Sequence, residues 1–174
     1  AIAWGPGVQA GKVRSAMAHV TDIAPTLFEL AGTRHPGTEY QGKPVLPLRG
    51  TSMLPLLQGR EQVVHGADKA IGWELGGRKA LRKGDWKIVS ANQPWGTGEW
   101  ELFNVAQDRS ESRNLAASNP QKLGELLVAW RDYVRETGTL EIPNLANRPG
   151  YSNGARYYED LKYEATLVPR TAKP

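Results

Sequence analysis

The hydrophobic and polar residues follow a helical period near the start of the chain. In "TDIAPTLFELAG" (21–32), apolar residues recur every three or four positions, Pro25 falls in the first turn and a glycine follows the last turn. Proline is tolerated in the first turn of a helix, and glycine is favoured just after its end. The segment therefore predicts a short amphipathic helix with Thr21 or Asp22 as its cap, preceded by an apolar strand over residues 1–4.

A loop and a smaller helix are expected next. Residues 33–50 hold three Pro and three Gly, which favour an ordered loop. In "TSMLPLLQG" (51–59), a hydroxyl residue can cap, a proline falls in the first turn and a glycine ends the pattern. We predict one short helix there, with Leu54 and Leu57 facing inward.

From residue 62 to residue 103 the period falls to two, which is typical of strands with one dry face and one wet face. Short links that contain glycine separate the apolar runs, and short links favour antiparallel pairing of neighbours. Within "DWKIV", Trp86 and Ile88 fall on one face, with the next residue of each on the other. The candidate strands are 62–66, 69–75, 78–84, 85–91 and 99–104.

The clearest helix prediction covers "SNPQKLGELLVAWRDYVRETG" (118–138), where Asn119 can cap with Pro120 at the first helical position. Its apolar stripe consists of Leu123, Leu126, Leu127, Trp130 and Val134. Such a stripe can cover the dry face of a sheet. We therefore predict an α+β fold in which a small four-stranded antiparallel sheet is covered by a C-terminal amphipathic helix.

The chain is expected to have three parts. Residues 1–60 hold the strand, the two helices and the loop, residues 61–140 form the sheet with its covering helix, and residues 141–174 form an extended tail. The content of 40% hydrophobic and 23% charged residues is typical of a folded chain, and no apolar run reaches the length of a membrane span. Cysteine is absent, which excludes disulfides and thiolate chemistry and leaves the compartment open.

Histidine and glycine patterns give few signs of catalytic chemistry. The three histidines, His19, His35 and His65, do not stand at metal-ligand spacing, and no phosphate-binding glycine motif or GxSxG elbow occurs in the sequence. We interpret His19 as a core or interface residue and His35 as a loop residue, whereas His65 could face a cleft from the end of a strand.

A basic binding module is the alternative function. Lysines and arginines interleave with Trp73, Trp86 and Trp100 as on a nucleic-acid stacking platform, but Trp86 and Trp100 each share a face with apolar residues and are expected in the core. The net charge of +4 is spread among 18 carboxylates, which favours a mixed solvated surface. Binding of an acidic polysaccharide or nucleic acid with steep salt dependence would identify this alternative.

Three stretches of the chain carry a family resemblance. "HVTDIAPTLFELAG" (19–32) matches a "V…D…PTLL…LAG" pattern, and "ALRKGDWKIV" (80–89) matches "R-A-[IL]-R-x-G-x-W-K". "ELFNVAQDRSESRNLA" (101–116) matches "x-L-Y-[DN]-L-x-x-D-P-x-E-x-x-N-L", with Arg109 where proline is usual. Together they span roughly residues 1–142, and in this order they resemble the C-terminal part of a sulfatase, close to the bacterial arylsulfatases.

The resemblance implies an alkaline-phosphatase-like α/β enzyme that hydrolyses sulfate esters with a formylglycine residue and a calcium ion. The formylglycine motif, C/S-x-P-S/A-R, is missing here: "SNPQK" fails at its last two positions, and "LPLR" follows Val45 where the nucleophile belongs. We therefore assign no catalytic residue and no metal ligand to this chain. Calcium and formylglycine are expected upstream in the parent protein.

The resemblance also implies a supporting role beside the sulfatase catalytic domain of the same parent chain. Residues 1–32 would then be a strand-helix piece of that larger α/β body. Taken alone, the chain should expose an apolar patch near residues 1–4 and 17–31, which would promote self-association. We expect no membrane partner and no nucleic-acid partner.

Candidate contacts with a sulfate ester substrate lie in "HGADKAIGWELGGRK" (65–79), because loops of the smaller domain can form one side of the family's cleft. His65 offers a hydrogen-bonding group, Trp73 a stacking surface and Glu74 a charge. Each of the three is also consistent with plain packing of the sheet.

Overall fold

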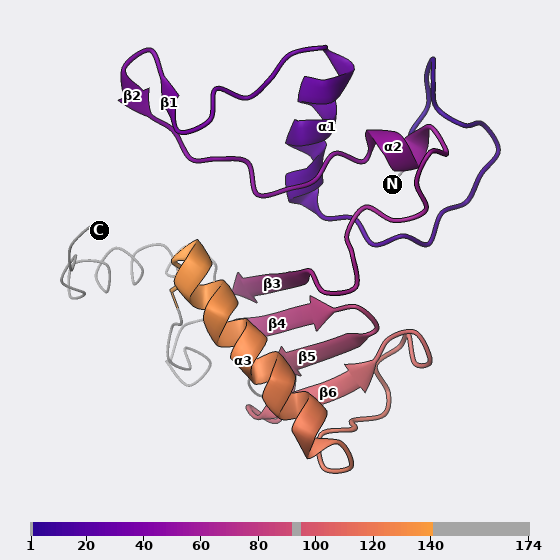
Figure 1. Ribbon diagram of the computed structural model, residues 1–174. Helices are drawn as coiled ribbons and strands as arrows, with labels where there is room; N and C mark the ends of the chain where they lie inside the picture. Colours follow the sequence, from indigo (N-terminus) through magenta and orange to yellow (C-terminus); the bar gives the residue numbers. More distant parts are fainter. Residues whose placement is uncertain (1, 92–94, 141–174) are drawn as a thin grey trace. The chain divides into compact units, whose positions relative to one another are not determined.

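The computed structural model describes residues 2–91 and 95–140 (Figure 1). The chain divides into two compact units, residues 1–69 and residues 70–174, and each is described by itself. The tail predicted over 141–174 lies outside the described residues. Among the described helices, none combines the length and the apolar character that crossing a membrane requires.

Short helices and loops make up the first unit. A 3₁₀ turn, η1 (Val20–Asp22), leads directly into α1 (Ile23–Leu30), and α2 (Leu54–Leu57) follows the long loop. Both predicted helices are thus confirmed. Inside the loop, β1 (Glu39–Tyr40) and β2 (Lys43–Pro44) pair as a small antiparallel hairpin that the proline and glycine content did not indicate.

Two predicted strands of this unit do not form. Residues 2–4 and 62–66 have no regular secondary structure. An apolar run of four residues or an alternating run of five is not sufficient for a strand, because the backbone groups of a strand also need a paired neighbour. Inward-facing residues of α2 also differ from the prediction: Leu54 and Leu56 are buried, whereas Leu57 is half-buried. A four-residue helix covers about one turn, so it has no defined stripe.

A four-stranded antiparallel sheet with the order β3-β4-β5-β6 forms the second unit. Its strands are β3 (Ala70–Leu75), β4 (Arg78–Lys83), β5 (Trp86–Ser90) and β6 (Trp100–Asn104). The link between β4 and β5 turns at Gly84, whose φ of 58° is one that glycine adopts without strain. With α3 (Pro120–Thr137) lying across this sheet, the predicted α+β class is confirmed (Figure 1).

The core lies between one face of the sheet and α3. Leu81 pairs with Ile88, and Ile88 pairs with Leu102, so the three side chains share a face. They form a buried cluster with Leu126 and Trp130 of α3. Packed against this cluster are the partly buried residues Trp86, Trp100, Leu123, Leu127, Tyr133 and Val134. The core position predicted for Trp86 and Trp100 and the apolar stripe of the helix are therefore confirmed.

The two ends of α3 differ in how they are capped. Asn119 occupies the N-cap position, but its side chain makes no capping bond and its amide donates to the carbonyl of Leu115 instead. At the other end, Gly138 takes the left-handed conformation with φ of 68° and donates its N–H to Val134. This is the αL ending that glycine favours.

The face of the sheet away from α3 is not uniformly exposed to solvent. Ile71 and Phe103 alternate with core residues and therefore lie on this outer face, yet they are only 7% and 4% exposed. The basic residues of β4 also divide between the faces: Arg82 lies outward, whereas Lys83 lies on the helix face and its Nζ is 3.4 Å from Glu125 of α3. Long side chains can cover an apolar face and still reach water at its margin.

Candidate functional site

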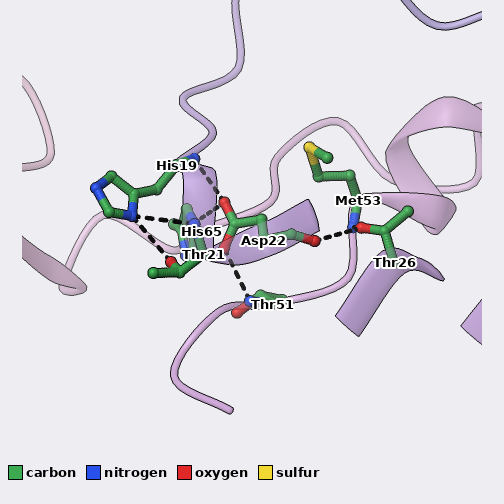
Figure 2. A network of polar contacts seen from close by, with 7 residues as sticks. All are labelled: His19, Thr21, Asp22, Thr26, Thr51, Met53 and His65. Carbon is green, nitrogen blue, oxygen red and sulfur yellow. Dashed lines mark hydrogen bonds and ion pairs between the residues drawn. The ribbon is translucent and has the colours of Figure 1, made fainter. Parts of the chain in front are cut away.

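A buried carboxylate joins three segments of the first unit (Figure 2). Asp22 is fully buried, and its Oδ2 accepts the N–H of His19 at 2.6 Å. Its Oδ1 accepts the N–H of Thr51, 29 residues further along the chain, at 2.9 Å. His65 places Nε2 2.7 Å from Oδ2. Both carboxylate oxygens are therefore engaged, as burial of a charged group requires.

Thr26 makes a second hydrogen-bonded connection between α1 and the segment before α2. Its hydroxyl donates to the carbonyl of Asp22 at 2.6 Å and accepts the N–H of Met53 at 2.8 Å (Figure 2). Beside it, a Cβ added to Gly50 would lie 2.0 Å from the carbonyl oxygen of Thr21. Glycine is needed there because the two backbones approach more closely than any side chain allows.

His19 also contributes to the start of the helical segment. It occupies the N-cap position of η1, where its side chain accepts the N–H of Thr21 while Asp22 reaches back to the backbone of His19. This reciprocal arrangement is a capping box. The prediction that the side chain of Thr21 or Asp22 caps the helix is therefore wrong: Asp22 occupies the N-cap position of α1 without a side-chain capping bond, and the capping side chain is that of His19 at the start of η1.

The charge on Asp22 is stabilised despite its burial. Burial alone raises the pKa of this carboxyl group, but the N–H groups of His19 and Thr51, together with His65, hold the pKa below its ordinary value. Asp22 therefore remains ionised in the folded chain at neutral pH. Its role at that pH is to fix the backbone around it.

This lowered pKa predicts that stability falls in acid. Because the pKa of Asp22 is lower in the folded state, its contribution is complete above the unfolded value of about 4 and is lost as pH falls through the folded value. We expect Asp22→Asn to abolish this part of the pH dependence. The unfolding free energies of the two proteins should approach each other as pH falls from about 4 through the folded-state pKa of Asp22. A parallel pH dependence of the two proteins would contradict the assignment.

The three candidate substrate contacts have different surroundings. His65 lies in a loop rather than at a strand end, and its side chain is 6% exposed in the pair with Asp22. Trp73 of β3 is 37% exposed on the outer face of the sheet. Glu74 points to the opposite face from Trp73, and its Oε1 accepts the N–H of Gly77 at 2.9 Å, which holds the β3–β4 turn. The sheet therefore does not bring Trp73 and Glu74 together on one face.

The stretch that resembles sulfatases after β6 is held by its own polar residues. Asp108 accepts the backbone N–H groups of Arg113 and Ser112, and these bonds, that of Arg113 first, hold the pKa of Asp108 below its ordinary value. Asn114 Oδ1 accepts the N–H of Leu102 at 3.1 Å and so ties this loop to β6. The polar residues of this pattern thus stabilise a loop. Their spacing in the sequence alone did not show whether they have a structural or a catalytic role.

Glu111, in the same loop after β6, forms an ion pair with the sheet. Glu111 has a left-handed backbone, with φ of 55°, and its Oε1 lies 2.6 Å from Nζ of Lys87 on β5. Non-glycine residues adopt this conformation at a small cost. The ion pair on the outer face connects this loop to β5.

The described residues do not fit the calcium ion that the family resemblance implies. Calcium takes about six to eight oxygen ligands. Within residues 2–91 and 95–140, no group of three or more His, Cys, Asp or Glu could hold a metal. Both oxygens of the buried Asp22 are already engaged by hydrogen bonds and by His65.

Comparison with known proteins identifies the family. No family model matches the chain. An uncharacterized sulfatase of Schizosaccharomyces pombe is 39% identical over 126 residues, which cover 72% of this chain and 22% of that protein. The chain belongs to the sulfatase family. Arylsulfatase K of Danio rerio is 32% identical and covers 74% of this sulfatase chain.

Relatives of known sequence and structure are much longer than this sulfatase chain. It spans 22% and 25% of the lengths of the two curated relatives. The crystal structure of Ps i-CgsB aligns with 96% of the chain at a TM-score of 0.61 and 25% identity, covering 33% of that protein. Ps i-CgsB has also been crystallised in complex with k-i-k-neocarrahexaose. The resemblance to sulfatases noted in the sequence is therefore confirmed.

Proposed function

We propose that this chain is the C-terminal, non-catalytic segment of a sulfuric ester hydrolase, and that the parent protein hydrolyses sulfate esters. The observation that carries the proposal is the 39% identity to a sulfatase over 126 residues. Calcium and formylglycine then belong to the remainder of the parent, and this segment supports the fold around them. The full engagement of Asp22 by backbone and His65 is consistent with a supporting role.

Exposed apolar residues support packing on a sulfatase catalytic domain in the same parent. Ile2, Trp4 and Val20 are strongly exposed, and the apolar face of α1 is about half exposed through Ile23, Leu27 and Leu30. These positions lie where the sequence predicted an apolar patch. A soluble chain rarely leaves so many large apolar side chains in water. In the parent they pack on the catalytic body, and in the isolated chain they promote self-association.

We assign carbohydrate sulfate esters to the parent as its substrate class. Support comes from Ps i-CgsB, which aligns with 96% of this chain and was crystallised with k-i-k-neocarrahexaose. The test is sulfate release by the parent protein from a sulfated galactan hexasaccharide and from an aryl sulfate. Release from either substrate supports the hydrolase, and release from the hexasaccharide supports the substrate class. A folded parent that releases no sulfate from either would contradict the proposal.

Trp73 is the proposed wall residue of the substrate cleft. Its side chain is 37% exposed, so it can contact a ligand without leaving a large cavity when truncated. We expect Trp73→Ala in the parent to raise the Michaelis constant by about tenfold, equivalent to about 1.4 kcal/mol, with little loss of stability. Steady-state kinetics and thermal unfolding of the same preparation check this. An unchanged Michaelis constant with a large loss of stability would show a packing role instead.

A further inference from the structure

An arginine and a tryptophan meet at one end of the sheet in the second unit. The β3–β4 turn and the β5–β6 loop lie at the same end, because β4 begins and β5 ends there. Arg78 is the first residue of β4, and its Cζ lies 3.9 Å from the ring centroid of Trp95 in the β5–β6 loop. Trp95 is 65% exposed, and Arg78 is exposed as well.

Arg78 differs from Arg82, Lys83 and Lys87 of the sheet, whereas its neighbour Lys79 also contacts an indole, with Nζ 5.6 Å from the ring centroid of Trp100. Lys83 pairs with Glu125, and Lys87 pairs with Glu111. Arg82 donates from Nε to the carbonyl of Gly84. Within the described residues, Arg78 has no carboxylate at ion-pair distance, and its contact is the indole face of Trp95. Stacking fixes the plane of a guanidinium and leaves its N–H donors directed outward from the edge.

The same face continues with apolar surface. Arg78 pairs across the sheet with Leu75, which is 73% exposed. Trp73 lies two residues before Leu75 and so shares its face. A cation on an indole, next to a leucine and a second indole, offers both an anion-binding group and stacking surfaces. Stacking on an indole suits the apolar face of a sugar ring, and a guanidinium binds an oxyanion through two parallel hydrogen bonds.

We infer that Arg78 and Trp95, continued by Trp73, form a binding surface for a sulfated carbohydrate, with the guanidinium on a sulfate group and the indole on a sugar ring. The inference rests on the proposed function for its substrate class and assigns two contact residues to this chain. Charge complementarity selects the ligand, because Arg78 has no carboxylate partner among residues 2–91 and 95–140 and so favours an anion, and because the sulfatase family acts on sulfate esters.

Calorimetric titration of the full chain with a sulfated galactan hexasaccharide tests the surface, with the desulfated hexasaccharide as the matched ligand. We expect the sulfated sugar alone to bind with measurable heat. Arg78→Gln should weaken binding about tenfold, since a charge-assisted bidentate contact is lost. Trp95→Ala should weaken it similarly, and Trp95→Phe should retain most of the affinity because a ring remains.

Arg131→Gln is the matched control, because it removes the same charge from an exposed position on α3. We expect it to change the affinity less than about twofold. Equal weakening by Arg78→Gln and Arg131→Gln would mean general attraction to a basic chain and would overturn the inference, as would equal binding of the desulfated sugar or no binding of either. Circular dichroism of each variant checks folding, and Arg78→Lys provides a second variant that keeps the charge.

The readout is binding by this chain, whereas the proposed function is tested by sulfate release from the parent. If the parent releases sulfate but this chain does not bind the sulfated sugar selectively, the inference is contradicted and the proposed function is still supported. Selective binding of the sulfated sugar by this chain, together with a parent that releases no sulfate, would support the binding surface and contradict the proposed function.

Discussion

Asp22→Ala is expected to destabilise the first unit by about 3 to 5 kcal/mol, because the groups that donate to this buried carboxylate lose their acceptor at a cost of about 1 to 3 kcal/mol each. The substitution leaves the N–H groups of His19 and Thr51 and the ring of His65 without their acceptor. Since these bonds join segments 29 and 43 residues apart, α2 should separate from α1. Hydrogen exchange at the amides of Leu54, Leu56 and Leu57 reports this directly and does not depend on the sheet unit.

Asp68→Ala is the matched control, because Asp68 is an exposed carboxylate of the same unit. It should change stability by less than about 0.5 kcal/mol. Asp22→Asn should fall between the two, since an amide keeps one acceptor oxygen but loses the charge. Similar exchange rates in Asp22→Ala and Asp68→Ala would show that the buried carboxylate does not hold the segments together.

Trp130→Ala should cost about 3 to 5 kcal/mol in the second unit, as expected for a large aromatic residue removed from a core. Trp130 is 2% exposed, and its ring centroid lies 5.5 Å from that of Trp100 and 5.8 Å from that of Tyr133. The truncation leaves a cavity between α3 and the sheet. Urea unfolding followed by near-ultraviolet circular dichroism measures the loss.

Val128→Ala supplies the comparison on the same helix, because Val128 is 48% exposed and lies off the buried stripe. Its expected cost is within about 0.5 kcal/mol. If both variants lost the same stability, the loss would reflect helix formation rather than packing on the sheet.

The sheet unit was predictable because its signals are local and periodic. The stripe of α3 and the alternation around Trp86 and Ile88 each repeat over many residues, and the predicted faces are the observed ones. Segment 62–66 shows the limit of this approach. Its alternation resembles a strand, but His65 turns toward Asp22 instead of entering a ladder.

The hydrogen bonds around Asp22 and the contact between Arg78 and Trp95 could not be predicted from the periodicity of hydrophobic residues. Thr51 meets Asp22 through its backbone N–H, a group that every non-proline residue carries, so no side-chain pattern marks the contact. Arg78 begins β4 and Trp95 lies in the β5–β6 loop, so the two approach only once the strands are in register. The family pattern did select Asp22, and the structure supplies the physical reason for its presence.

Sulfate release by the isolated chain is the most direct test of a segment that supports a sulfatase without catalysing the reaction. The purified chain is incubated with an aryl sulfate and added calcium, beside the parent protein under the same conditions. We predict release by the parent and none above the buffer rate by the chain. Release by the chain that Asp22→Asn or His65→Gln abolishes would place catalytic groups within these residues and contradict the proposal.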